Sequence, residues 1–298
     1  IDDAELAWAV ENDVEVYVFE PGRLERLLEV AEATGMPAKI HLQLETGMNR
    51  MGLTGGQLEK VAEKLARNRE LFELVGVCTH FAGAERVANH VRVTNQFELY
   101  RKRLEMLAEQ DLEPSYRHVA SSAATIAYPE ARLDMVRIGI LQYGFWPSTE
   151  RLMGYLGDDA DDADPLERVI TWKSEVLDVQ EVEAGTFVGY GNSYLARDEM
   201  KVALVPVGYA DGFARSLSNH GRVLINEHRA SVVGKVSMNV LTADVTERPQ
   251  TEKGDEVVLI GQQGDVSISV APFGERSDRM NYERLTKLST RIPRTVVD

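Results

Sequence analysis

Cysteine is almost absent from this sequence, because Cys78 is the only one in 298 residues. A lone cysteine cannot form a disulfide within the chain, which is typical of a reducing compartment, so we expect a cytoplasmic protein. No apolar run comes near the ~18 residues that a membrane-spanning helix needs, and no membrane partner is expected. Basic residues are also scarce, since 33 Lys and Arg face 48 Asp and Glu, a net charge of −15. Such an acidic surface repels phosphate backbones, so nucleic acid is not an expected partner.

The first half of the chain alternates short apolar runs with amphipathic stretches. Apolar residues at Leu24, Leu27, Leu28 and Ala31 recur at helical spacing, and Gly35 then provides a helix stop. Further helices are predicted over residues 1–9, 58–65 and 88–109. Strands are predicted over residues 14–19, 38–44, 74–80, 115–120 and 135–140. This regular alternation of strand and helix indicates a parallel sheet.

Five strand–helix units leave a sheet with open edges, which invite unwanted pairing. A closed parallel barrel normally has eight strands. Three further units of ~30 residues each would need roughly 90 residues, and residues 1–9 read as a helix with no strand before it. The expected fold is therefore an α/β fold, a (β/α)8 barrel of the TIM type with its first strands upstream of Ile1.

The second half of the sequence lacks the alternation of strands and helices. Residues 158–164 form an acidic run without apolar periodicity, which is typical of a solvated loop. Beyond it, strands are predicted over residues 176–182, 201–207, 222–225, 230–245 and 256–260. The expected domains are a barrel over residues 1–150, an acidic linker over 151–168 and a β-rich domain over 169–298.

The most unusual polar residues of the first half lie at predicted strand ends, where the working residues of a parallel barrel gather. Arg50 follows the second predicted strand, His80 ends the third, Ser122 follows the fourth, and Arg137 lies in the fifth. Two arginines, a histidine and a backbone rich in Gly and Ser suit an anionic ligand that bears phosphate or carboxylate. Spacing alone leads no further than this.

Nine short segments of the chain, in their order, resemble the alanine racemase family. They are E-T-G-M-N-R-M-G at residues 45–52, T-H-F-A at 79–82, S-S-A-A at 121–124, V-R-I-G-I at 136–140, G-Y-G-N-S-Y at 189–194, V-G-Y-A-D-G at 207–212, V-G-K-V-S-M-N at 233–239, N-Y-E-R-L-T at 281–286 and R-I-P-R at 291–294. Each segment alone is weakly specific, but nine in the same order cover essentially the whole chain.

The resemblance implies an enzyme that interconverts L-alanine and D-alanine and supplies D-alanine for peptidoglycan. It implies a barrel of fold type III of the pyridoxal-phosphate enzymes, which holds pyridoxal 5'-phosphate as cofactor. It implies no metal ion. It also implies a homodimer in which the C-terminal β-domain of one subunit completes the site of the other. Racemisation needs a base on each face of the amino acid, because the Cα proton leaves one face and returns on the other.

Three residues match the family's catalytic residues. Tyr190 matches the tyrosine that serves as one base, and His80 matches the histidine next to it. A tyrosine has a pKa near 10 and needs nearby cations to favour its phenolate. Arg137 matches the arginine that faces the cofactor's ring nitrogen, and a guanidinium can only donate, so it keeps that nitrogen unprotonated. The competing interpretations are a core aromatic for Tyr190, a satisfied core histidine for His80 and a surface ion pair for Arg137.

The remaining matches concern binding. Arg50 matches the arginine on the substrate carboxylate side, although a solvated loop arginine is the competing interpretation. Four residues match the family's contacts to the cofactor phosphate, namely Ser122, Gly139, Ile140 and Tyr282. Gly139 and Ile140 would act through their backbone amides. Tyr209 and Met238 match family residues at the entryway and at the rim of the substrate site.

The sequence departs from the family pattern in three places. A motif like K-x-x-x-Y-G-H-G, which carries the cofactor lysine, does not occur. Neither Lys39 nor Lys235 has the right neighbours to replace that lysine, so we expect it upstream and expect the printed chain alone to lack a normal Schiff base and activity. Gln43 stands where many members have a lysine, and Asn239 stands where many have aspartate. Both changes neutralise the substrate end and leave strict alanine specificity open.

Three alternatives remain open. A broader racemase would act on serine or basic amino acids, although the bulk of Tyr282, Tyr209 and Met238 favours a small substrate. A barrel protein that binds the cofactor without catalysis would lack the β-domain and the tyrosine base. A related barrel decarboxylase would need a cysteine near the site. We expect Cys78 to be a buried core thiol on the strand face opposite His80.

Overall fold

The structure is a computed structural model that describes residues 2–157, 164–268 and 285–297. It divides into two compact units, the first formed by Ile1–Gln142 with Trp146–Pro165 and the second by Tyr143–Phe145 with Leu166–Asp298. Within the described ranges, no helix combines the length and the apolar character needed to cross a membrane.

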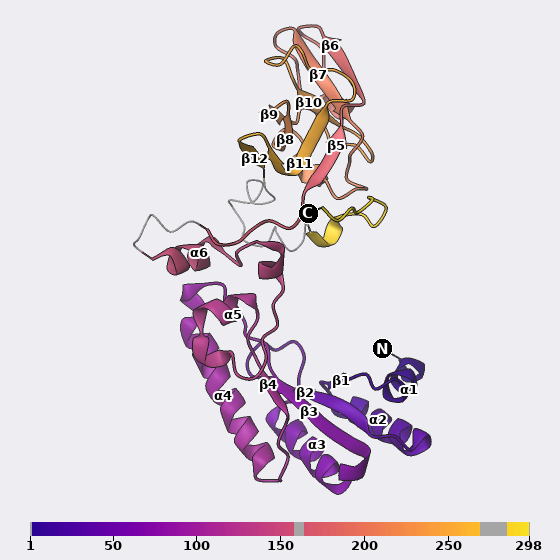
Figure 1. Cartoon of the computed structure of the whole chain (residues 1–298), viewed down its shortest axis with the longest axis vertical. Helices are drawn as coiled ribbons and strands as arrows, with labels where there is room; N and C mark the ends of the chain where they lie inside the picture. Colours follow the sequence, from indigo (N-terminus) through magenta and orange to yellow (C-terminus); the bar gives the residue numbers. More distant parts are fainter. Residues whose placement is uncertain (1, 158–163, 269–284, 298) are drawn as a thin grey trace. The chain divides into compact units, whose positions relative to one another are not determined.

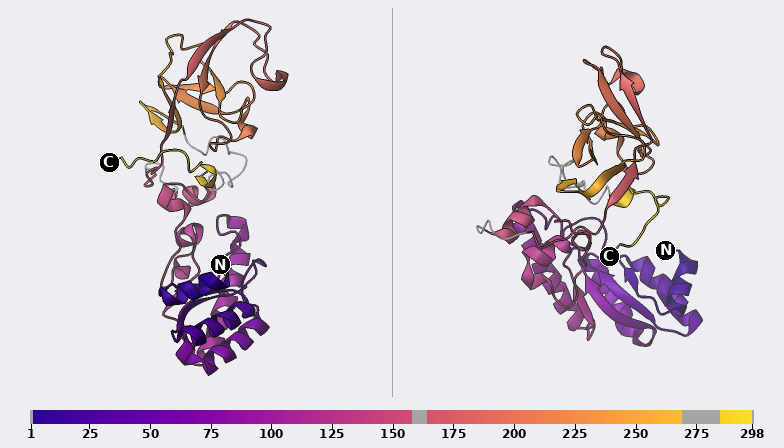
Figure 2. Two further views of the ribbon diagram at one scale, coloured as in Figure 1. Left: turned by 90° about the vertical axis from the view of Figure 1, so that its right-hand side faces the viewer. Right: turned by 45° about the horizontal axis from the view of Figure 1, so that its top comes forward.

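Unit 1 is built on a parallel four-stranded sheet in the order β1-β2-β3-β4. The strands are β1 (Val16–Val18), β2 (Ala38–Gln43), β3 (Phe72–Cys78) and β4 (Tyr116–His118). The α-helices are α1 (Asp3–Glu11), α2 (Pro21–Thr34), α3 (Gly55–Arg67), α4 (His90–Ala108), α5 (Ser122–Ala127) and α6 (Thr149–Leu156). Short 3-10 helices are η1 (Arg69–Leu71), η2 (Val87–Asn89), η3 (Pro129–Ala131) and η4 (Ile140–Tyr143). The strands lie side by side and α2 to α4 flank them, as Figures 1 and 2 show.

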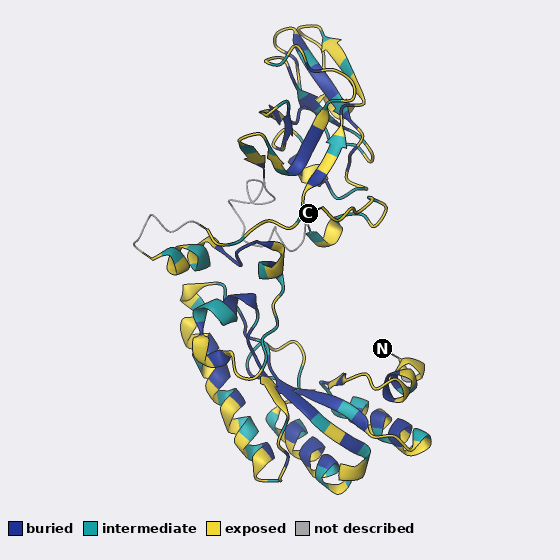
Figure 3. Ribbon diagram, in the orientation of Figure 1, coloured by how far each residue is buried: buried dark blue, intermediate teal, exposed yellow. Residues whose placement is uncertain are grey.

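Local sequence signals set the ends of the predicted helices. Pro21 occupies the first turn of α2, and Gly35 ends this helix in the left-handed conformation with φ 68°, as predicted. In α3, Thr54 and Gln57 form a capping box. The buried face of α3 is formed by Leu58, Val61, Ala62 and Leu65, which confirms the predicted periodicity. Figure 3 shows the same division, with buried residues on the strands and on one side of each long helix.

The strand predicted over residues 135–140 is wrong. Only one isolated parallel bridge, Ser121↔Arg137, joins this segment to its neighbour. The backbone N–H of Arg137 donates to Ala120 O at 2.8 Å, but the N–H of Gly139 donates to the Ser122 hydroxyl at 2.8 Å. Because a side chain takes the hydrogen bond that a ladder would need, the segment leaves the sheet and enters η4 at Ile140.

Unit 2 is built from antiparallel strands. They are β5 (Trp172–Glu175), β6 (Asp178–Val182), β7 (Met200–Val205), β8 (Arg222–Ile225), β9 (His228–Ser231), β10 (Leu241–Asp244), β11 (Glu256–Gln263) and β12 (Val266–Ile268), with the 3-10 helices η5 (Tyr190–Asn192) and η6 (Arg215–Leu217). One sheet has the order β10-β7-β6 and the other β12-β11-β8-β9, and β5 pairs with β11.

Two predicted strands of unit 2 are wrong in extent. The segment 230–245 divides into β9 and β10, because Gly234 has φ 75° and its N–H donates to the Asn219 side chain at 2.6 Å. Within the segment 176–182, only Asp178–Val182 forms a strand, β6, which pairs with β7. Its first two residues connect β6 to β5, which pairs with β11. In these places an apolar run correctly indicated extended backbone, but it did not indicate where the chain stops pairing with one strand and starts pairing with another.

Candidate active site

A cavity of about 350 Å³ opens in unit 1 where β2 and β3 end. It is lined by Tyr17, Phe19, Gln43, Arg50, Met51, Cys78, Thr79, His80 and Arg137. Three predicted site residues, Arg50, His80 and Arg137, therefore line one cavity. Two guanidinium groups face this space, and no carboxylate is among its described lining residues. That charge pattern suits an anionic ligand.

Arg137 is anchored by acceptors at the ends of β3 and β4. Its Nη1 donates to His118 Nδ1 at 2.7 Å and to His118 O at 2.8 Å. Its Nη2 donates to Thr79 O at 2.8 Å and lies 3.5 Å from His80 Nδ1. A guanidinium bound to several fixed acceptors has little freedom to rotate, so the structure holds this cation in place at the cavity wall.

His80 follows β3 and is half-buried. Burial lowers the pKa of His80 below its ordinary value, and the positive charges of Arg137 and Arg50 lower it further. The imidazole is consequently neutral near pH 7, and it can accept or donate one proton at a neighbouring polar group.

Cys78 corrects one prediction. The thiol is buried, as expected, and burial raises its pKa to about 12. The expected location on the face opposite His80 is wrong, because both residues line the same cavity. Side chains two positions apart in a strand point to the same face. A thiol with so high a pKa is protonated and is a poor nucleophile. Its location at the cavity meets the requirement of the decarboxylase alternative for a cysteine near the site.

The loop after β2 is organised by Glu45. Its carboxylate accepts from the backbone N–H of Gly47 at 2.6 Å and of Arg50 at 3.2 Å. Burial opposes ionisation of Glu45, but four backbone hydrogen bonds from the loop lower its pKa overall. The exposed side chain of Arg50 therefore extends from a loop whose backbone is fixed. Gln43, at the end of β2, donates to Met51 O at 3.4 Å.

Gln96 is a positioning residue that the sequence did not reveal. It lies in α4 and is only 2% exposed. Its Nε2 donates to Thr46 Oγ1 at 3.3 Å and to His80 O at 3.2 Å, while its Oε1 accepts from the N–H of Ala82 at 2.8 Å. One amide thus joins the loop after β2 to the segment that holds His80. A lone polar residue on an apolar helix face gave no indication of these partners.

Three of the predicted phosphate-binding residues, Ser122, Gly139 and Ile140, come together in space, although 17 residues separate Ser122 from Gly139 in the sequence. Ser122 is buried at the start of α5, and its Oγ accepts from the N–H of Gly139. The hydroxyl hydrogen of Ser122 remains able to donate to an anion. Ile140 begins η4, one residue further along. Tyr282, predicted for the same role, lies outside the described residues.

A second cavity, of about 550 Å³, belongs to unit 2. It is lined by Tyr190, Tyr209, Arg215, Lys235, Val236, Ser237, Met238, Asn239 and Val240. Three predicted residues, Tyr190, Tyr209 and Met238, lie here together. The side chain of Tyr190 is 73% exposed, which excludes a core aromatic. Tyr190 and His80 belong to different units, and their predicted proximity stays a prediction.

Gly208 lets two segments of the second cavity approach each other. The N–H groups of Tyr209 and Ala210 donate to Ser237 O and Met238 O at 3.1 and 3.0 Å. A Cβ on Gly208 would lie 2.2 Å from Met238 O, a backbone atom that cannot move cheaply. Only glycine fits this close backbone approach.

Gly208→Ala is therefore expected to destabilise the protein by about 1–3 kcal/mol, the usual cost of forcing extra volume into a packed site. Urea unfolding measures the change. Gly56→Ala is the matched control, because nothing lies within 4 Å of a Cβ there and the residue is inside α3. That variant should be at least as stable as the original protein. Equal stability of the two variants would contradict the close approach at Gly208.

Acid is expected to destabilise unit 1 through His118. Burial, Arg137 and His41 lower the pKa of His118 from 6.5 to about 4. Between these values the unfolded chain binds more protons than the folded chain, so stability falls as the pH drops from about 6.5 to about 4 and levels off below. Urea unfolding at a series of pH values should show a flatter dependence for His118→Asn. Replacing the exposed His220 by Gln should leave the dependence unchanged, and an unchanged dependence in His118→Asn would refute the assignment.

Residues 1–147 match the family model described as alanine racemase, N-terminal domain, and residues 169–296 match alanine racemase, C-terminal domain. An alanine racemase from Leptospira interrogans is 37% identical over 264 residues, which are 88% of this chain and 67% of that relative. One from Methanococcus maripaludis is 34% identical over 298 residues, 99% of this chain and 76% of the relative.

Solved structures give the same result. The alanine racemase from D-cycloserine producing Streptomyces lavendulae is 29% identical with a TM-score of 0.90, over 98% of this chain and 75% of that chain. The alanine racemase from Streptomyces coelicolor A3(2) is 32% identical with a TM-score of 0.89, over 97% and 74%. These similarities confirm the predicted fold class, a parallel α/β barrel followed by a β-rich domain.

Proposed function

The chain belongs to the alanine racemase family, and from this premise we propose that it interconverts L-alanine and D-alanine with pyridoxal phosphate, as a supply of D-alanine for peptidoglycan. The observation that carries the proposal is the guanidinium of Arg137, fixed at a cavity wall beside His80. A racemisation assay of the protein with alanine, serine and lysine tests it. Turnover of alanine alone supports an alanine racemase, and turnover of serine or lysine supports the broader racemase.

The described residues fit pyridoxal phosphate. The cofactor carries an anionic phosphate and a ring nitrogen with a lone pair. The cavity of unit 1 offers two guanidinium groups and no carboxylate among its described lining residues. We assign Ser122 and the backbone amides of Gly139 and Ile140 to the phosphate, together with Tyr282, and Arg137 to the ring nitrogen. When bound, the cofactor supplies an electron-withdrawing ring that makes the Cα proton of an amino acid acidic.

Arg137 controls which reaction follows. A guanidinium is charged at any ordinary pH and has no proton to give up, so it donates a hydrogen bond but does not protonate its acceptor. With the cofactor bound, Arg137 would hold the ring nitrogen unprotonated, which would favour return of the proton to Cα over its transfer to another carbon in a transamination. Arg137 thereby favours racemisation.

Tyr190 moves one of the two protons in this proposal. Its phenol lies exposed in a cavity that Arg215 and Lys235 also line. Tyr190 takes the Cα proton from one face and returns it in the reverse reaction. A second base must serve the opposite face. Lys39 is not a candidate, since its Nζ pairs with Asp13 at 2.8 Å, and no described residue lining the unit 1 cavity is a lysine.

Gln43 and Asn239 define the substrate end in this proposal. Gln43 lines the cavity of unit 1, and Asn239 lines that of unit 2. Both are neutral where many family members carry charge, so binding of a substrate carboxylate depends on Arg50. The exposed Tyr190 and the β-rich unit 2 favour an enzyme over a barrel protein that only binds the cofactor.

We further propose a cytoplasmic homodimer in which the Tyr190 cavity of one subunit completes the Arg137 cavity of its partner. Complementation tests this directly. Subunits that carry Tyr190→Phe and subunits that carry Arg137→Gln, each strongly impaired alone, should regain activity when they are refolded together, because a mixed dimer has one intact site. Activity that stays absent in mixed dimers would place both residues of a site in one subunit.

A further inference from the structure

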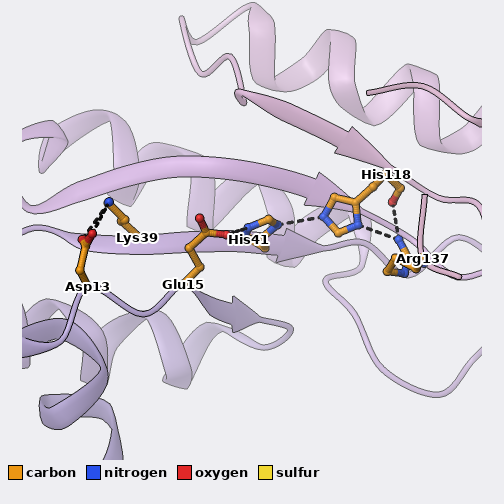
Figure 4. Close-up of polar contacts among 6 residues, drawn as sticks. All are labelled: Asp13, Glu15, Lys39, His41, His118 and Arg137. Atoms are coloured by element: carbon orange, nitrogen blue, oxygen red, sulfur yellow. Dashed lines mark hydrogen bonds and ion pairs between the residues drawn. The ribbon is translucent and has the colours of Figure 1, made fainter. Parts of the chain in front are cut away.

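Four side chains form a continuous line of hydrogen bonds from the surface of unit 1 to Arg137 (Figure 4). Glu15 Oε2 lies 2.6 Å from His41 Nε2. His41 Nδ1 lies 2.9 Å from His118 Nε2. His118 Nδ1 lies 2.7 Å from Arg137 Nη1. The line begins at a carboxylate, crosses two imidazoles and ends at the guanidinium that faces the cavity.

The two ends of this line fix its direction. Arg137 can only donate, so His118 Nδ1 must accept. A neutral imidazole carries one proton, so His118 carries it on Nε2 and donates to His41 Nδ1. His41 therefore carries its own proton on Nε2 and donates to Glu15, which as a carboxylate can only accept. The requirements from the two ends agree, and each donor meets one acceptor.

The sheet is built to hold His41 in this line. His41 is 4% exposed and His118 is 0% exposed, so water does not compete for their ring nitrogens. The β2–β3 pairing shifts register between Ile40 and His41, and His41 then faces Gly76. A Cβ on Gly76 would lie 2.1 Å from His41 Nδ1, within the ring's own space. The ring of Tyr17 stacks on His41 with centroids 5.4 Å apart.

We propose that Glu15 is a positioning residue that acts through His41 and His118 on Arg137. The carboxylate attracts the Nε2 proton of His41, which makes His41 Nδ1 a stronger acceptor. That in turn polarises the Nε2–H of His118 and makes His118 Nδ1 a stronger acceptor for the guanidinium. Hydrogen bonds in a buried chain reinforce one another in this way. The link to racemisation rests on the proposed function, but the chain of hydrogen bonds does not.

Nitrogen NMR of protein labelled with ¹⁵N-histidine tests the proposal without any assay of activity. In the original protein, His41 and His118 should both show an unprotonated Nδ1 and a protonated Nε2. A scalar coupling across the hydrogen bond should join His118 Nε2 to His41 Nδ1. In Glu15→Gln, the His118 Nδ1 signal should shift and the coupling should weaken, although Glu15 has no contact with His118. Gly76→Ala, which displaces the His41 ring, should abolish the coupling.

Asp13→Asn is the matched control. It removes the same charge two residues away, from a carboxylate whose partner is Lys39, and Asn tolerates the positive φ of 59° at this position. The signals of His118 should not change in this variant. The proposal is overturned if either histidine carries its proton on Nδ1 in the original protein, or if Glu15→Gln leaves the His118 signals unchanged. If the protein racemises alanine but lacks these NMR signals, the line of hydrogen bonds is refuted and the proposed function is not. If the signals are present but the protein does not racemise alanine, only the proposed function is refuted.

Discussion

Tyr190→Phe is expected to lower alanine racemisation by about 10²–10⁴-fold, the usual contribution of a positioned general base. The phenyl ring fills the same space but has no hydroxyl to take or return the Cα proton. The side chain is 73% exposed in its cavity, so the variant should fold normally. Polarimetry measures racemisation, and the loss should be equal from L-alanine and from D-alanine, because the equilibrium constant cannot change.

Tyr194→Phe is the control for this prediction. The same hydroxyl is removed four residues along, from a partly buried ring that packs against the cluster containing Val188 and Met200. Racemisation should change little in this variant. If Tyr190→Phe retains the original rate while Tyr194→Phe loses it, the assignment of Tyr190 as the base is wrong.

Arg137→Gln is expected to have the second large effect. The shorter amide cannot reach all the acceptors that the guanidinium satisfies, so Thr79 O and His118 Nδ1 lose their donors. Each buried group left unsatisfied costs about 1–3 kcal/mol. The loss of charge also weakens binding of an anionic cofactor. We expect lower stability in urea, a requirement for more pyridoxal phosphate, and a larger share of transamination among the remaining turnovers.

Arg132→Gln provides the comparison. Arg132 is an exposed arginine five residues earlier, and its Nε donates to Thr125 O at 2.9 Å. Its replacement should cost little, because exposed polar groups that lose a partner bind water instead. Equal losses in the two variants would show that Arg137 contributes only as a structural arginine.

The helices were predictable because their signals are local. The apolar spacing in α2 and its stop at Gly35 lie within one short segment, and the structure reproduces both. The segment 135–140 was not predictable in the same way. Its apolar pattern favours a strand, but the deciding hydrogen bond comes from the hydroxyl of Ser122, which lies 17 residues away in sequence. No periodicity within the segment contains that information.

The site shows the same limit. Strand ends and motifs led us to expect Arg50, His80 and Arg137 in one site, and all three line one cavity, while their roles stay predictions. His41 and His118 could not be joined from sequence, since 77 residues separate them and only the sheet register makes them neighbours. Each reads alone as a polar residue within an apolar strand. The presence of two histidines inside strands of a parallel sheet was the only available signal.

The most direct test of the central claim is proton exchange in D₂O. The protein is incubated with pyridoxal phosphate and L-alanine, and the reaction is followed by NMR for loss of the Cα proton and by polarimetry for loss of optical activity. The account predicts that both occur, that Tyr190→Phe loses racemisation, and that this variant still exchanges the Cα proton of one enantiomer from the remaining face. Exchange without loss of optical activity in the unsubstituted protein would contradict it, because only one face of the substrate would then meet a base.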